Sequence, residues 1–77
     1  MPTIISEDGF QIRIYPADHE PPHVHVFKGG TEVKISIKNQ VNILNPKTMK
    51  ASDIKKALEI VQKHLSLLLA KWEEING

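Results

Sequence analysis

The chain has 77 residues and no cysteine, which predicts one small domain, because so short a chain cannot divide into two cores. The missing cysteines exclude disulfide scaffolds, zinc fingers with thiolate ligands and thiol nucleophiles. Ten Lys and Arg residues nearly cancel nine Asp and Glu residues, so the overall charge does not indicate a nucleic acid or an anionic membrane as partner.

The first predicted strand follows a turn signal at residues 7–9. Phe10, Ile12 and Ile14 alternate with polar residues, which is the pattern of a half-buried strand, and Pro16 ends it. Two consecutive prolines at residues 21–22 then favour a stiff, extended loop into the next strand, because proline fixes its backbone and lacks an amide donor.

A β-hairpin is predicted for residues 23–38, where two strand-like runs flank Gly29-Gly30. The turn sets a register that puts apolar residues on one face and polar residues on the other. The pairs are Val24–Ile35 and Val26–Val33 on the core face, and His23–Ser36, His25–Lys34 and Phe27–Glu32 on the opposite face. A shift by one residue would expose the valines, so turn and hydrophobic pattern specify the same register. Residues 41–44 are a candidate fourth strand.

One long helix is predicted for about residues 52–75, since apolar side chains recur there at alternating spacings of four and three. At 1.5 Å per residue this helix is roughly 35 Å long, whereas a six-residue strand spans ~20 Å. A helix longer than its sheet leaves an apolar overhang, which is a liability in water. We therefore expect its C-terminal half to bind a second copy of the chain or a small cognate protein. The alternative is that the helix crosses the sheet diagonally and that Met49, or Ile4 and Ile5, cover the overhang. The expected interface residues are Leu65, Leu68, Leu69 and Trp72.

These elements predict one α+β domain over residues 1–77. A three- or four-stranded, mainly antiparallel sheet, with its strands within residues 9–44, packs against the long helix. Leu67 to Ala70 form the longest apolar run, far short of the roughly 20 residues that span a bilayer. We expect no membrane segment and a cytoplasmic location.

The residues best suited to catalysis or metal binding are three histidines within residues 18–26. On one interpretation, His23 and His25 are solvated side chains on the polar face of a strand. On a second, the His-x-His spacing aims two imidazoles at one divalent metal ion such as zinc, and His19 and Glu20 complete its shell. No other cofactor is expected.

A third interpretation is metal-independent RNA cleavage, which makes the chain a candidate ribonuclease. The hairpin register places His23 and His25 beside Lys34, and the first strand adds Arg13 to the same face. One imidazole would remove the 2′-hydroxyl proton and the other would protonate the leaving oxygen, while the two cations offset charge on the phosphorane. Lys34 opposite His25 favours the neutral form of that ring, so His25 is the expected base and His23 the expected acid.

The sequence resembles a family of small prokaryotic proteins classed as a domain of unknown function. Several segments carry the resemblance: Met1-Pro2-Thr3-Ile4, Gly9-Phe10, Glu20-Pro21-Pro22-His23-Val24-His25-Val26, Lys28-Gly29 and Trp72-Glu73. The resemblance implies that residues 20–26 hold the hallmark positions. It also implies a gene arrangement like a toxin–antitoxin pair, and hence a protein partner. We therefore expect a partner-binding component of such a module that acts on RNA, with a metal-binding accessory domain as the alternative.

Overall fold

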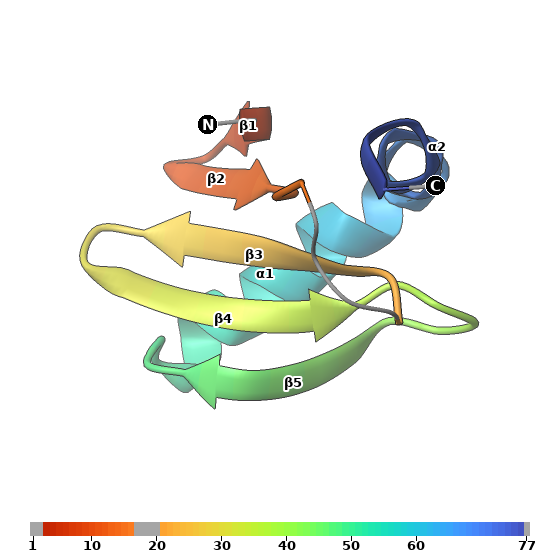
Figure 1. The fold of residues 1–77 in the computed structure, drawn as a ribbon. Coiled ribbons are helices and arrows are strands. Elements are labelled where there is room, and N and C mark those ends of the chain that lie inside the picture. Colours follow the sequence, from red (N-terminus) through yellow and green to blue (C-terminus); the bar gives the residue numbers. More distant parts are fainter. Residues whose placement is uncertain (1–2, 17–20, 77) are drawn as a thin grey trace.

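The computed structural model describes residues 3–16 and 21–76 and confirms the α+β class. Five antiparallel strands lie side by side in chain order, and two helices follow them (Figure 1). The elements are β1 (Thr3–Glu7), β2 (Phe10–Arg13), β3 (His23–Lys28), β4 (Thr31–Ser36), β5 (Asn42–Lys47), α1 (Ala51–Lys63) and α2 (Leu65–Asn76). No helix in these described residues is long and apolar enough to cross a membrane.

The sheet has more strands than the three or four expected, because the segment before Asp8 also pairs. Asp8 and Gly9 both adopt positive φ angles, 52° and 81°, in a two-residue loop that joins β1 to β2. Asp-Gly is a preferred dipeptide for such tight hairpins, since both central residues need positive φ. An irregular register between Thr3 and Ile5 breaks strict alternation in β1, and Ile4 and Ile5 are both half-buried.

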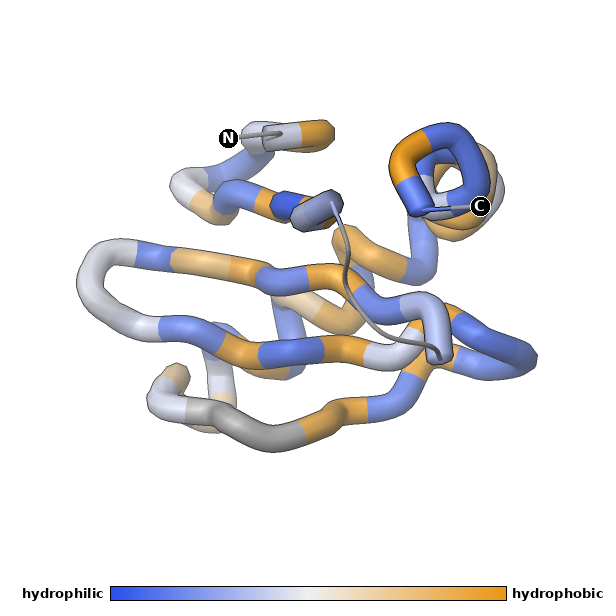
Figure 2. The backbone as a smooth tube through the Cα atoms, in the orientation of Figure 1, coloured by the Kyte–Doolittle hydropathy of each residue, from blue (hydrophilic) through white to orange (hydrophobic). Residues whose placement is uncertain are grey.

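The register of the β3–β4 hairpin is confirmed. All five predicted pairs, from His23–Ser36 to Phe27–Glu32, are present, and Lys28 pairs with Thr31 across the Gly29-Gly30 turn. The alternation of hydrophobic and hydrophilic residues along both strands is visible in Figure 2. The core face therefore carries Val24 and Val26, and the histidines lie on the opposite face.

The hydrophobic core lies between that apolar face and the helices, with α1 crossing behind β3, β4 and β5 (Figure 1). Strands β2, β3 and β4 each contribute two buried apolar side chains. Ala57, Ile60 and Val61 of α1 complete this layer. Their i, i+3, i+4 spacing gives α1 one apolar stripe, as a helix covering a sheet requires.

The expectation of one long helix is wrong, because the helix breaks at His64. The backbone of His64 (φ −107°, ψ 21°) leaves the helical region, and α2 begins at the next residue. Figure 1 shows that α2 runs in a different direction from α1 and lies beyond the end of β2. A straight helix would overhang the sheet, so the break turns the second half back onto the domain.

The break also overturns part of the expected interface. Leu68 and Trp72 are 0% and 1% exposed within the single chain, so neither lies on an unpartnered seam. Leu65 is half-buried against the core. Leu69 is 37% exposed and its neighbour Leu67 is 44% exposed. The apolar surface left for a partner on α2 is therefore much smaller than the sequence predicts.

Candidate functional site

The two histidines of β3 lie in a cluster of four rings. The ring centres of His23 and His25 are 5.2 Å apart, Tyr15 lies 4.7 Å from His25, and Trp72 lies 5.3 Å from His23. We call Tyr15, His25, His23 and Trp72 the ring cluster. The cluster joins the segment after β2, strand β3 and helix α2, so it forms only when α2 folds back.

The ring cluster is a largely buried site, which argues against the first interpretation, that His23 and His25 are solvated side chains. His23 is 7% exposed and the side chain of His25 is 15% exposed. The register is as predicted, but Tyr15 and Trp72 pack against the two imidazoles. Asn76 of α2 also donates a hydrogen bond from Nδ2 to the carbonyl oxygen of Tyr15, at 3.1 Å. This bond ties α2 to the segment that carries Tyr15.

Each imidazole is oriented by a hydrogen bond from its Nδ1. His23 Nδ1 lies 2.9 Å from the carbonyl oxygen of Pro21, and His25 Nδ1 lies 3.2 Å from Oε2 of Glu32. A carbonyl and a carboxylate accept but do not donate, so Nδ1 carries the proton in both rings. In the neutral form, each ring then has its lone pair on Nε2. This is the arrangement of an oriented general base or of a metal-binding histidine.

The two cations expected at this site lie in one row across the sheet with His25. Arg13 of β2 and Lys34 of β4 are its direct neighbours on either side. The guanidinium of Arg13 lies 4.6 Å from the ring centre of Phe27 and donates to Oε1 of Gln11. The structure therefore brings together all four residues proposed from the sequence for RNA cleavage.

Two buried donors at the site have no hydrogen-bond acceptor among the described residues. They are Nε of Arg13 and Nε1 of Trp72. An unsatisfied buried donor costs about 1–3 kcal/mol. Trp72 adjoins His23 and Arg13 adjoins His25, so the two donors lie at either end of the histidine pair.

Glu32 is a site residue that the sequence analysis missed. Its carboxylate contacts His25, and its backbone N–H donates to Thr48 Oγ1 at 2.8 Å, while its carbonyl accepts from Thr48 N at 2.8 Å. The predicted β3–β4 register could have revealed the contact between Glu32 and His25. His25 lies opposite Lys34, so Glu32 is its diagonal neighbour on the same face, within reach of a long side chain.

The expected metal ligands are only partly described. His19 and Glu20 lie outside the described residues, whereas His23 and His25 are adjacent in the ring cluster. Within residues 3–16 and 21–76, no group of three or more His, Asp or Glu side chains is arranged to hold a metal ion. The described part of the site thus offers two imidazoles.

The fourth histidine, His64, belongs to a separate ion-pair group at the helix break. Glu7 at the end of β1 accepts hydrogen bonds from Lys63 Nζ at 2.6 Å and from His64 Nε2 at 3.0 Å. The bond from Lys63, followed by that from His64, holds the pKa of the Glu7 carboxyl below its ordinary value. The same bond to Glu7 raises the pKa of Lys63. The group fastens the edge strand to the junction of α1 and α2.

The depressed pKa predicts how Glu7 contributes to stability as pH changes. Its contribution is present above the ordinary value of 4.5 and is lost as pH falls through the lower pKa of the folded state. Glu7→Gln removes the charge and keeps the shape. The free energy of unfolding should therefore be lower in the variant than in the wild type at neutral pH, and the two should converge in acid. Urea unfolding between neutral pH and pH ~3 measures this. A difference that stays constant over this range would contradict the prediction.

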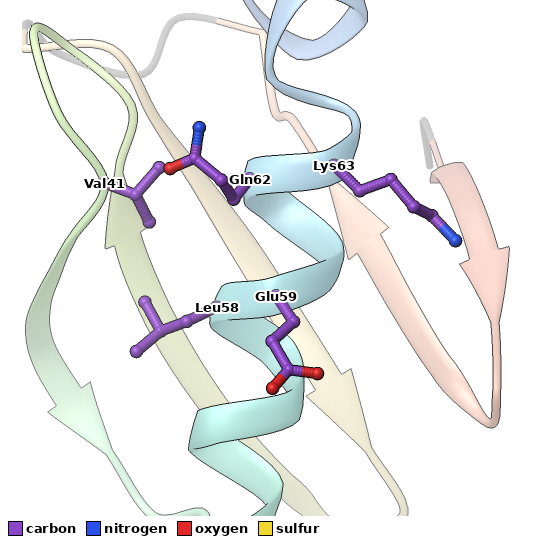
Figure 3. Close-up of a pocket in the computed structure, with 5 residues that line it drawn as sticks. All are labelled: Val41, Leu58, Glu59, Gln62 and Lys63. Atoms are coloured by element: carbon purple, nitrogen blue, oxygen red, sulfur yellow. The ribbon is translucent and has the colours of Figure 1, made fainter.

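A surface pocket of about 520 Å³ lies away from the ring cluster, between α1 and the connection from β4 to β5. Figure 3 shows Val41 and Leu58 facing each other across it, while Lys63 extends away toward β1. Glu59 and Gln62 also line it. The lining holds one carboxylate, that of Glu59, and no histidine.

Most of the chain, including the ring cluster, falls within one known sequence family. A family model described as a domain of unknown function (DUF4160) matches residues 9–73. The match runs from the β1–β2 turn into α2 and includes the whole β3–β4 hairpin. No curated protein and no solved structure matches the chain.

Proposed function

Because the chain belongs to the DUF4160 family, whose description states no function, we propose a function from the site itself: the β2–β3–β4 face binds single-stranded RNA and cleaves it without a metal. One observation carries the proposal. A carboxylate-oriented imidazole, His25, lies beside a second imidazole and between two cations, Arg13 and Lys34. These are the groups that transfer of a phosphate ester to a neighbouring hydroxyl needs.

His25 is the general base of the proposed reaction. Its Nε2 takes the proton of the ribose 2′-hydroxyl, and the 2′-oxygen then forms a bond to the adjacent phosphorus. Glu32 is a positioning residue, because it holds the proton on Nδ1 and stabilises the imidazolium that forms. The same carboxylate–imidazole arrangement orients histidine bases in other hydrolases.

His23 is the general acid. As the bond between phosphorus and the 5′-oxygen breaks, His23 in its protonated form gives a proton to that oxygen. The products are a 2′,3′-cyclic phosphate and a 5′-hydroxyl end. The proton gained by His25 and the proton lost by His23 balance, so the step needs no oxidant, reductant or metal.

Arg13 and Lys34 offset the negative charge that builds up on the phosphorane oxygens. They occupy the strands on either side of His25, so a phosphate over His25 would lie between them. Preorganised donors of this kind usually stabilise the transition state more than any other group in such a reaction.

The chemistry of the products tests the proposal. A DNA oligonucleotide with one ribonucleotide should be cut only after that ribonucleotide, to give a 2′,3′-cyclic phosphate end in mass spectrometry, and EDTA should not slow the cut. The matched all-DNA oligonucleotide should stay intact, because it lacks the nucleophile. A 5′-phosphate product, or cleavage of the all-DNA control, would overturn the mechanism.

A protein partner remains part of this proposal. A small nuclease in a two-component, toxin–antitoxin-like module would need a cognate protein that blocks its site. The exposed Leu67 and Leu69 of α2 are the best candidates for contact. Two leucines cover far less than the ~800 Å² per partner of a stable interface. The small exposed apolar area of α2 therefore favours a heterologous partner that also covers other elements over a homodimer formed through α2 alone.

A further inference from the structure

His23 and His25 are spaced as two ligands of one metal ion. They occupy alternate positions of β3 and so lie on the same face, with ring centres 5.2 Å apart. Two imidazoles on a tetrahedral ion, with metal–nitrogen distances of about 2.0–2.1 Å, have ring centres about 5 Å apart. We propose that this pair binds a late first-row divalent ion such as Zn²⁺, and that the bound ion switches the site off.

The hydrogen bonds around the two rings support this assignment. Histidines that bind metals almost always donate their other ring N–H to a backbone carbonyl or a carboxylate. His23 does so to the carbonyl oxygen of Pro21, and His25 does so to Glu32. In both neutral rings the lone pair is therefore on Nε2, the nitrogen that binds the ion. Both outer partners of a two-histidine site are thus in place.

The donor set selects the class of ion. Two imidazoles and no thiolate suit Zn²⁺, Cu²⁺ or Ni²⁺ better than Mg²⁺ or Ca²⁺, which prefer oxygen ligands. No third ligand is arranged around the pair within the described residues.

Inhibition by the ion is the part of the inference that rests on the proposed function. A metal ion on Nε2 of His25 takes the lone pair that would accept the 2′-hydroxyl proton. The same ion on His23 prevents its protonation, so the general acid is lost as well. Zn²⁺ should therefore inhibit RNA cleavage with a midpoint equal to its dissociation constant.

The binding test uses the tag-free chain and Zn²⁺ alone. Isothermal titration of the metal-free protein should show one ion per chain. His23→Ala and His25→Ala should each weaken binding by at least about 10-fold, and Glu32→Gln by about 10- to 100-fold through the outer shell. His64→Ala is the matched control, because His64 lies in the Glu7 ion-pair group, and it should bind as the wild type does. Equal affinity of the wild type and the β3 variants would overturn the site.

The tryptophan supplies an independent readout. The sequence has one Trp, and its ring lies 5.3 Å from that of His23. Paramagnetic Cu²⁺ on the histidine pair should therefore quench Trp72 fluorescence in the wild type, and the His23→Ala and His25→Ala variants should lose this quenching at the same copper concentration. If the protein binds the ion but cleaves no RNA, the metal site is supported and the nuclease is contradicted. If it cleaves RNA and Zn²⁺ does not slow the reaction, the nuclease is supported and inhibition by the ion is contradicted.

Discussion

Replacing His25 with alanine is expected to lower kcat/KM for RNA cleavage by about 10²–10⁴-fold, the range that a general base contributes. His25 has the carboxylate of Glu32 on Nδ1 and a cation on each neighbouring strand, so it is the group on which the proposed mechanism depends most. The measurement is the initial rate of cleavage of a single-stranded RNA. His64→Ala should retain the wild-type rate and serves as the control for loss of a histidine.

A substrate whose leaving group needs no proton can distinguish the general acid from the general base. A nucleoside 3′-(4-nitrophenyl phosphate) releases nitrophenolate, which needs no proton, so loss of the general acid should not slow it. His23→Ala should therefore be impaired on RNA and close to wild type on this ester, whereas His25→Ala should be impaired on both. Equal impairment of the two variants on both substrates would contradict the assignment of base and acid.

Glu32 acts through His25, and its replacement should show this. Glu32→Gln keeps the size of the side chain, but its amide can donate to Nδ1 of His25 and so favours a proton on Nε2, the wrong nitrogen for a base. We expect kcat to fall with KM nearly unchanged, and the acidic limb of the pH–rate profile to move. Lys34→Ala should lower kcat as well, because Lys34 offsets the charge that builds up on the phosphorane.

The β3–β4 hairpin is predictable in full because two local signals agree. The Gly29-Gly30 turn and the alternation of valines with polar residues each specify the same pairing. The same register, read from the amino-acid sequence, places His23, His25 and Lys34 on one face. The diagonal contact from Glu32 to His25 follows from it too, once diagonal neighbours are considered along with direct ones.

Strand β1 was missed because its alternation is broken. Asp8-Gly9 signals a tight hairpin, but Ile4 and Ile5 are consecutive apolar residues, and a strand with one buried face is expected to alternate. The irregular register between Thr3 and Ile5 accounts for the departure. A bulge of this kind is set by the sheet as a whole, so the local sequence does not reveal it.

The helix break is a tertiary effect that the apolar spacing cannot show. The stripe continues from Val61 to Leu68 with heptad spacing, and neither glycine nor proline lies at the junction. The comparison of helix and strand lengths correctly indicates that a straight helix would overhang the sheet, but it assumes that the helix is unbroken. The chain instead breaks at His64, where Glu7 of β1 binds both Lys63 and His64.

That fold-back also explains why the histidines are less exposed than alternation predicts. Alternation determines which face a side chain occupies, and β3 follows it. Whether the face is covered depends on segments distant in the chain, here Tyr15 after β2 and Trp72 on α2. The site is therefore partly a product of the same bend that completes the core.

Trp72→Ala is expected to destabilise the domain by about 3–5 kcal/mol, the usual cost of removing a fully buried aromatic side chain. Trp72 is 1% exposed and contacts both the core and His23. Domains of this size have little stability to spare, with ~5 kcal/mol as the low end of the usual range, so a variant of such a domain would keep at most about 2 kcal/mol. Urea unfolding followed by circular dichroism measures the loss without relying on the tryptophan.

The dependence on protein concentration decides whether Trp72 is buried by its own chain or by a second copy. If burial is intramolecular, the urea midpoint of the wild type should be constant from micromolar to millimolar protein; an interface residue would make it rise with concentration by mass action. Leu69→Ala is the matched control on the same helix. Since Leu69 is 37% exposed, its loss should change stability by no more than about 0.5 kcal/mol. A midpoint that rises with concentration, or equal losses of unfolding free energy for the two substitutions, would indicate that α2 forms an intermolecular interface. The ring cluster would then be incomplete in the isolated chain.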